Sequence, residues 1–180
     1  MGTILKTQNL TKDYGNQRGA SDITFEIHNS EIVGFIGPNG AGKTTTMKML
    51  TRLIAPDKGE LFLFNKRIES EADYLSISDK IVFLPSEGAL YDNLTPLQIF
   101  NYAAKLYSCS TKLALKLSER FKIDLNVKVK LLSLGNRRKV AIVQALMNSP
   151  KLAILDEPTS GLDPFMQRQV LELIMASKKT

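Results

Sequence analysis

The stretch Gly37-Pro38-Asn39-Gly40-Ala41-Gly42-Lys43-Thr44-Thr45 decides the fold that this sequence predicts. It fits the pattern G-x-x-x-x-G-K-[ST] at every position, which describes a loop whose backbone N–H groups converge on phosphate oxygens. Gly37, Gly40 and Gly42 allow backbone angles that a Cβ atom would hinder. We expect the whole stretch to bind nucleotide phosphates, with the Lys43 ammonium near the β- and γ-phosphates and the Thr44 hydroxyl on Mg²⁺.

The sequence on both sides of this loop has the patterns of a strand and a helix. Residues 32–36 form an apolar run that predicts a buried strand. Beyond the loop, apolar residues recur at helical spacing: Met47, Leu50, Leu53 and Ile54. A helix that begins near Lys43 directs its positive dipole end toward the phosphates. Strand, glycine-rich loop and helix in this order predict a P-loop nucleotide triphosphatase core.

Composition limits the class of protein. A length of 180 residues suffices for one domain with a proper core, and no apolar run approaches the length of a membrane span. The single cysteine, Cys109, fits a reducing compartment, so the sequence predicts a cytoplasmic protein. The net charge of +6 comes from scattered basic residues. Their densest cluster, residues 137–139, favours a solvated helix end over a nucleic-acid patch.

The remaining chain predicts strands at both ends of the core and helices between them. Residues 3–10 and 23–28 have the alternation of half-buried strands, and residues 81–84 and 152–155 are apolar runs typical of buried strands. Thr95 and Gln98 form a capping box that starts a helix. We expect an α/β fold with a P-loop core, an antiparallel N-terminal β subdomain and an inserted helical subdomain. The expected parts of this single domain are residues 1–30 (mainly β), 31–87 (P-loop core), 88–133 (helical) and 134–180 (core).

Two carboxylates follow the apolar strand at residues 152–155. A strand that ends in acidic residues, downstream of a P-loop, is the expected second half of a nucleotide triphosphatase site. Asp156 is predicted to hold Mg²⁺, and Glu157 is predicted to act as the general base on an attacking water.

Further motifs resemble those of one family. Residues 132–136, Leu-Ser-Leu-Gly-Asn, look like the LSGGQ signature of ABC-type ATPases. Residues 152–157 resemble the Walker B strand of the family, and residues 160–163 match its D-loop. Tyr14 stands where an aromatic residue stacks on adenine. The resemblance runs from about residue 3 to the end, and it is strongest to the ATPase subunits of bacterial ABC-2-type exporters.

The resemblance implies a function and partners. Members bind ATP and Mg²⁺, and two such domains sandwich two ATP molecules. Ser133 and the backbone of Gly135 would then contact the γ-phosphate held by the other subunit. The implied partners are a second nucleotide-binding domain and a transmembrane permease, without nucleic acid. The implied location is the inner face of the cell membrane.

The sequence departs from the family pattern at three places. Ser86 stands where most relatives have the Q-loop glutamine, which puts coupling through this loop in doubt. Leu134 and Asn136 replace a glycine and a glutamine of the signature, and we expect little loss because Leu134 can point outward. The chain ends at Thr180, before the strand that carries the switch-loop histidine, so we expect it to be C-terminally incomplete.

Two alternatives to a transporter ATPase stay open. One is a catalytically impaired nucleotide-binding fragment or regulatory remnant, which Ser86 and the absent switch histidine favour. The other is a soluble ABC ATPase that acts on ribosomes or nucleic acid, which the positive net charge favours.

Overall fold

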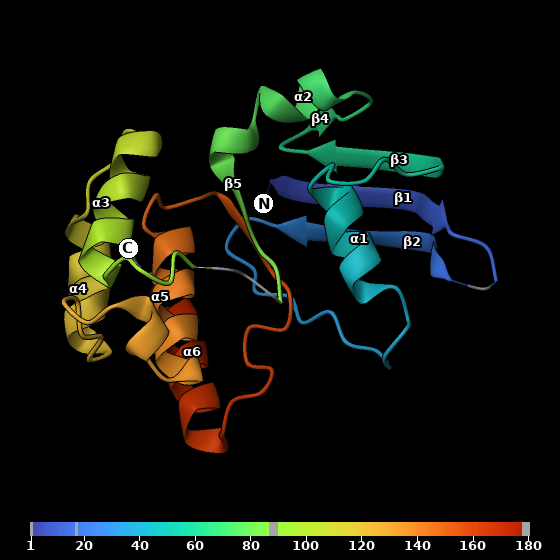
Figure 1. The fold of residues 1–180 in the computed structure, drawn as a ribbon. Helices are drawn as coiled ribbons and strands as arrows, with labels where there is room; N and C mark the ends of the chain where they lie inside the picture. Colours follow the sequence, from blue (N-terminus) through green and yellow to red (C-terminus); the bar gives the residue numbers. More distant parts are fainter. Residues whose placement is uncertain (1, 17, 87–89, 178–180) are drawn as a thin grey trace. The chain divides into compact units, whose positions relative to one another are not determined.

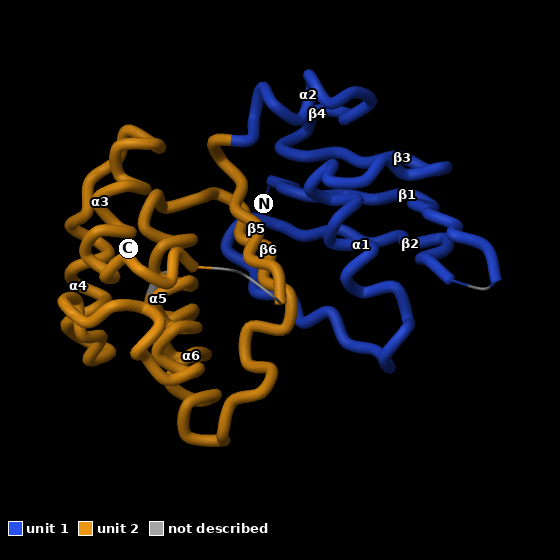
Figure 2. Tube along the Cα trace, in the orientation of Figure 1, with its two compact units in different colours: residues 1–78 blue, residues 79–180 orange. Residues whose placement is uncertain are grey.

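The computed structural model describes residues 2–16, 18–86 and 90–177. The chain forms two compact units, residues 1–78 and residues 79–180 (Figure 2). Each unit has its own sheet and its own helices, and each is described separately below.

The first unit is built on an antiparallel sheet with the strand order β2-β1-β3-β4 (Figure 1). Its strands are β1 (Thr3–Asp13), β2 (Gly19–His28), β3 (Lys58–Leu63) and β4 (Lys66–Arg67). Helix α1 (Lys43–Leu50) contacts β1 and β2, and the short helix α2 (Glu71–Leu75) follows β4. Apolar side chains of β1, β3 and α1 form the core of the unit: Leu5, Leu10, Leu61, Leu63 and Met49. The antiparallel N-terminal sheet is therefore confirmed.

Two predictions about the surroundings of the P-loop are wrong. Residues 32–36 form no strand, and their apolar side chains are exposed, Ile36 by 93%. A strand needs a hydrogen-bonded partner, and over residues 2–16, 18–86 and 90–177 no strand pairs with this segment. Helix α1 also ends at Leu50 rather than continuing to Ile54, because Arg52 takes a left-handed backbone angle with φ 53°.

The second unit contains the parallel pair β5 (Ile81–Leu84) and β6 (Leu152–Leu155). Both strands have the predicted bounds, and Ile81 lies opposite Leu152. A 3₁₀ turn, η1 (Ser78–Lys80), leads into β5. The other helical elements are α3 (Pro96–Leu106), α4 (Lys112–Arg120), η2 (Val129–Leu131), α5 (Leu134–Leu146) and α6 (Pro164–Ser177).

Helices α3 to α6 share one hydrophobic core with the end of β5. Its fully buried side chains include Phe100, Ile99, Val140, Ile142 and Leu173. The capping box that starts α3 is confirmed: the Thr95 hydroxyl accepts a hydrogen bond from the Gln98 amide, and the Gln98 side chain accepts one from the Thr95 amide. In the described part of the chain, no helix is long and apolar enough to cross a membrane.

Candidate functional site

The glycine-rich loop packs closely on the hairpin between β1 and β2. Gly40 and Gly42 both take left-handed backbone angles with φ 84°, whereas Gly37 does not. A Cβ atom at position 42 would lie 2.2 Å from the Gly19 carbonyl oxygen and 2.9 Å from the Ala20 Cβ atom. Only glycine fits at position 42 without displacing the backbone of the hairpin. Both the left-handed φ angle and the close contact with Gly19 therefore require glycine there.

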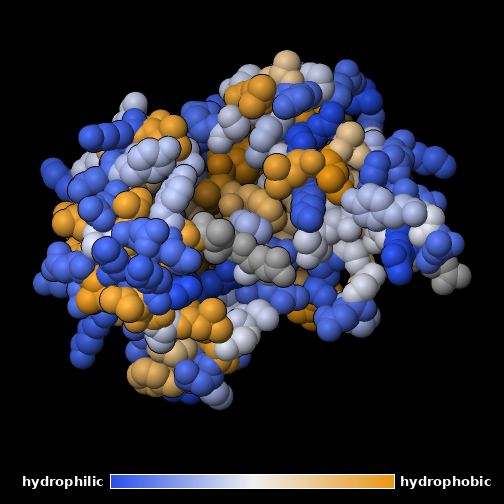
Figure 3. Space-filling view, viewed as in Figure 1, coloured by the Kyte–Doolittle hydropathy of each residue, from blue (hydrophilic) through white to orange (hydrophobic). Residues whose placement is uncertain are grey.

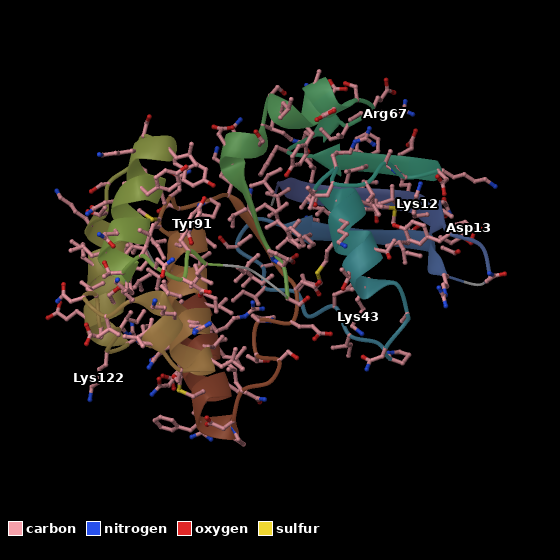
Figure 4. The ribbon with its side chains drawn as sticks, in the orientation of Figure 1. Lys12, Asp13, Lys43, Arg67, Tyr91 and Lys122 are labelled. Carbon is pink, nitrogen blue, oxygen red and sulfur yellow. The ribbon has the colours of Figure 1, made fainter. Side chains whose placement is uncertain are left out.

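Lys43 begins α1, and its side chain turns back onto the loop (Figure 4). Its ammonium donates hydrogen bonds of 2.9 Å to the carbonyl oxygens of Gly37 and Pro38. The first turn of α1 is closed by Thr46, whose amide and hydroxyl both donate to the Gly42 carbonyl oxygen. The ammonium therefore lies at the N-terminal end of α1, where the helix dipole favours an anion.

A cavity of 510 Å³ lies between the glycine-rich loop and the hairpin. It is lined by residues of both segments: Asp13, Gly15, Asn16, Arg18, Gly19, Ala20, Ser21, Gly40 and Ala41. Its size is typical of a small-molecule site. The half-exposed ring of Tyr14 belongs to the same turn but does not line the cavity. Arg18 was not among the predicted site residues, because no sequence motif marks it and only the fold brings it to the loop.

Asp57 holds the base of this hairpin in place. Its carboxylate accepts hydrogen bonds from the Lys12 ammonium at 2.7 Å and from the Asp13 amide at 2.9 Å. The hydrogen bond from Lys12 is the main reason that the pKa of Asp57 lies below its usual value. The Lys12 ammonium also lies 5.9 Å from the centre of the Tyr14 ring (Figure 4 labels Lys12 and Asp13).

In the second unit, the two predicted acidic residues follow β6. Asp156 is 1% exposed, and its amide donates to the Leu84 carbonyl oxygen at the end of β5. Glu157 is exposed and takes a left-handed backbone angle with φ 46°, which is unusual for a residue with a side chain. The two carboxylates therefore stand at the carboxyl ends of a parallel strand pair, where α/β proteins place their ligands.

Arg138 on α5 lies against this strand end. It is 9% exposed, and its guanidinium donates to carbonyl oxygens of both loops that follow β5 and β6. Burial lowers the pKa of Arg138, while the charges of Asp156 and Glu157 oppose that shift. The predicted solvated helix end is therefore wrong for this residue, because its donors find backbone partners inside the unit.

Lys139, the next residue, is also buried, with 4% exposure. Its ammonium donates to the Phe121 carbonyl oxygen at 2.9 Å and to the Gln169 side chain at 3.3 Å. Burial lowers the pKa of the Lys139 ammonium. Arg137 is partly buried, and its guanidinium donates to the carbonyl oxygens of Lys130 and Leu132 and lies 3.6 Å from the Asp92 carboxylate.

Ser133 starts α5 as its N-cap. Its hydroxyl accepts a hydrogen bond of 3.3 Å from the Asn136 amide. Gly135 is buried against α6, since a Cβ atom there would meet the end of the Met166 side chain at 2.2 Å. Leu134 points outward and is exposed, as predicted. The helix N-terminus thus presents a hydroxyl and amide groups at one point of the surface.

Comparison with known proteins identifies the family. The chain matches a family model described as ABC transporter over residues 20–160. It is 36% identical to the bacitracin transport ATP-binding protein BcrA of Bacillus licheniformis, over 99% of the chain and 59% of BcrA. This chain belongs to the ABC transporter ATP-binding family. It is also 36% identical to the lantibiotic transport ATP-binding protein SrtF of Streptococcus pyogenes, over 97% of the chain and 75% of SrtF.

A solved structure of an ABC ATPase agrees with this assignment. It is described as the dimeric post-hydrolysis state of the ATP-binding cassette MJ0796 bound to ADP and Pi. The TM-score is 0.80 at 25% identity, over 98% of this chain and 83% of that one. The predicted α/β fold class is therefore confirmed. The chain spans 59% of the length of BcrA and 75% of the length of SrtF.

The ABC motifs divide between the two units. The P-loop and Tyr14 belong to the first unit, and Ser86, Ser133, Gly135, Asp156 and Glu157 belong to the second. Within the second unit, Arg138 brings together Ser86 and the two acidic residues. Thr44 and Asp156 supply a hydroxyl and a carboxylate, which are oxygen donors of the kind that Mg²⁺ prefers. The donor chemistry therefore fits the predicted metal.

Proposed function

We propose that this chain binds ATP with Mg²⁺ and hydrolyses it as the nucleotide-binding subunit of an ABC transporter. The observation that carries the proposal is the P-loop itself, with Gly40 and Gly42 in left-handed conformations and with Gly40 and Ala41 lining a cavity of 510 Å³. The ABC family powers transport with ATP, which supports the same conclusion. We propose that the direction of transport is export, because the motifs resemble those of ABC-2-type exporter ATPases.

The P-loop, residues 37–45, would bind the phosphates and Tyr14 would stack on the adenine. The Lys43 ammonium already lies at the loop, so it can exchange carbonyl oxygens for β- and γ-phosphate oxygens with a small movement. Backbone amides at the start of α1 add the positive end of the helix dipole. Thr44 and Asp156 are the residues that we propose as Mg²⁺ ligands, and the metal would supply positive charge to the phosphates.

Glu157 would act as the general base. Its exposed carboxylate follows the buried β6, so it can accept a proton from a water that attacks the γ-phosphate. The attack breaks the bond between the γ-phosphorus and the bridging oxygen, and it yields ADP and inorganic phosphate. Ser86, two residues after the end of β5, would contact water or metal through a short hydroxyl.

A second copy of such a domain would complete the site. Ser133 is exposed at the N-cap of α5, and its hydroxyl and the helix N-terminus would suit an anion held by another subunit. The helical part of the second unit would contact the permease. Its surface is mainly hydrophilic over α3 and α4 (Figure 3), but it exposes an edge-to-face pair, Tyr91 and Tyr102, with ring centres 6.0 Å apart. The chain would then work at the inner face of the membrane, without nucleic acid.

The test of the proposal separates binding from hydrolysis. Glu157→Gln is expected to lower ATP turnover by about 10²- to 10⁴-fold and to leave the dissociation constant of ATP unchanged, because it removes only the proton acceptor. Lys43→Ala is expected to weaken ATP binding by about 10- to 100-fold, because it removes a charge-assisted contact. Titration with a fluorescent ATP analogue and release of phosphate measure the two effects.

Exposed residues of α4 supply matched controls for these variants. Glu119→Gln and Lys116→Ala make the same chemical changes outside the proposed site and should alter neither quantity. Turnover that persists in Glu157→Gln would show that Glu157 is not the base. Unchanged affinity in Lys43→Ala would refute the phosphate site.

A second candidate, a subunit that binds ATP without hydrolysing it, is favoured by one observation. Ser86 stands where the family has a glutamine, and its carbonyl oxygen is already held by Arg138. In this case the wild type and Glu157→Gln would bind ATP equally and neither would release phosphate. Restoring the longer side chain with Ser86→Gln should then raise turnover.

A further inference from the structure

Arg138 uses every donor of its guanidinium. The group has five N–H bonds, and it lies within hydrogen-bond distance of the same number of backbone carbonyl oxygens. The bonds are Nε to Pro158 at 3.1 Å, Nη1 to Pro85 and Ser86 at 3.1 Å each, and Nη2 to Asp156 and Glu157 at 2.9 Å each. Because the guanidinium is planar and all its N–H groups are bonded, its position relative to the five carbonyl oxygens is fixed.

These acceptors belong to two separate loops of the second unit. Pro85 and Ser86 follow β5, whereas residues 156–158 follow β6. The sequence separations from Arg138 range from 18 to 53 residues, so the contacts are tertiary and not part of a local turn. One side chain on α5 therefore joins the loop that contains Ser86 to the loop that contains Glu157.

The loop after β6 has a conformation that depends on such a cation. The carbonyl oxygens of three successive residues, 156–158, point to one group, and their dipoles would repel one another without a positive charge between them. Glu157 in addition takes the left-handed angle of φ 46°, which residues with a Cβ atom adopt at a cost. The guanidinium of Arg138 is the cation that these carbonyl oxygens contact.

We propose that Arg138 is a positioning residue that sets the place of the Glu157 carboxylate and links it to the loop at Ser86. This inference rests on the proposed function, because it concerns the base assigned there. A general base must lie within hydrogen-bond reach of the water that it deprotonates, and a displacement of about 1 Å can cost about 100-fold in rate. Because both loops bind the same guanidinium, a displacement of residues 85–86 would shift Arg138 and with it the position of Glu157.

Two substitutions of Arg138 test this role in the protein expressed from its own gene. Arg138→Met keeps much of the aliphatic stem but removes all five donors, and it is expected to lower kcat about 10- to 100-fold. Arg138→Lys keeps the charge and at most three donors, so its kcat should lie between that of Arg138→Met and the wild type. The dissociation constant of ATP should stay within about twofold in both, since neither variant touches the P-loop. Arg168→Met, an exposed arginine on α6, is the control and should change neither quantity.

A double-mutant cycle with Glu157→Gln shows whether Arg138 acts through Glu157. If it does, Arg138→Met should change the residual rate of the Glu157→Gln protein by less than about threefold, because the group that it positions is already gone. A purely structural role would lower the rate by the same factor in both backgrounds and would weaken ATP binding as well. An equal loss of rate in both backgrounds would overturn the proposal, and so would weaker ATP binding in Arg138→Met.

The outcomes separate the inference from the function on which it rests. If Glu157→Gln lowers turnover but both Arg138 variants keep the wild-type kcat, the inference alone is wrong. If Glu157→Gln has no effect, the assignment of the base and the inference are wrong together. Should Arg138→Met fail to unfold cooperatively, Arg138→Lys carries the test, and an unchanged kcat with Lys overturns the proposal.

Discussion

Three glycines around the P-loop allow backbone strain to be separated from steric contact. Gly42 combines a left-handed angle of φ 84° with a close approach to the Gly19 carbonyl oxygen. Gly40 has the same angle but nothing within 4 Å of the place of a Cβ atom, and Gly34 has neither a left-handed angle nor a neighbour. Alanine at position 34 therefore introduces neither effect, alanine at position 40 introduces backbone strain alone, and alanine at position 42 introduces backbone strain and a steric clash.

The magnitudes follow from the two effects. Gly34→Ala should be neutral or stabilising by up to about 1 kcal/mol, because alanine reduces the entropy of the unfolded chain. Gly40→Ala should cost about 1 kcal/mol, since left-handed strain of about 1–2 kcal/mol is partly offset by the same entropy term. Gly42→Ala should cost about 1–3 kcal/mol more, because the neighbour at 2.2 Å is backbone and cannot rotate away.

Urea unfolding followed by far-UV circular dichroism measures the free energies, and titration with a fluorescent ATP analogue measures binding. We expect ATP affinity to fall most in Gly42→Ala, because its loop must move away from the hairpin that borders the cavity. Equal destabilisation by Gly40→Ala and Gly42→Ala would refute the reasoning, since the close approach to Gly19 would then contribute nothing.

Two further predictions concern the hairpin. Tyr14→Ala should weaken ATP binding about 5- to 100-fold if the ring stacks on adenine, whereas Tyr14→Phe should bind as the wild type does, and an equal loss in both variants would exclude stacking. Asp57→Asn tests the pH dependence of the contact with Lys12. Because the pKa of Asp57 is lowered in the folded protein, its contribution to stability is complete above about pH 3.9, the unfolded value, and is lost as the pH falls through the folded pKa. The difference in unfolding free energy between wild type and Asp57→Asn should therefore be present at pH 7 and vanish at the lowest pH, and a constant difference would contradict the assignment.

Local patterns predicted most elements of the fold. The apolar runs at β5 and β6 gave the observed bounds, and the capping box at Thr95 gave the start of α3. Residues 32–36 have the same apolar pattern as β5, yet they form no strand. Apolar composition shows that a segment would gain by burial, but a strand also requires a partner, which the local sequence does not specify.

The sequence predicted site residues where a motif has one physical purpose. The P-loop and the acidic pair after β6 were proposed because their residue types follow from phosphate and metal chemistry. Arg138 was not recognised, because its partners lie 18 to 53 residues away and its neighbours are also basic. Helical spacing offers a usable signal, since Gly135, Arg138, Ile142 and Leu146 recur on one buried face of α5. A charged residue in register with an apolar face predicts a buried network rather than a solvated surface.

The position of Lys43 has a consequence for the energetics of ATP binding. The ammonium already uses two of its three donors on the carbonyl oxygens of Gly37 and Pro38. Phosphate oxygens must therefore compete with the loop for the same protons, and the free energy of binding contains only the difference between the two sets of partners. The carbonyl oxygens of Gly37 and Pro38 thus act as internal competitors of ATP, which lowers the affinity but keeps the ammonium at the loop before the triphosphate arrives.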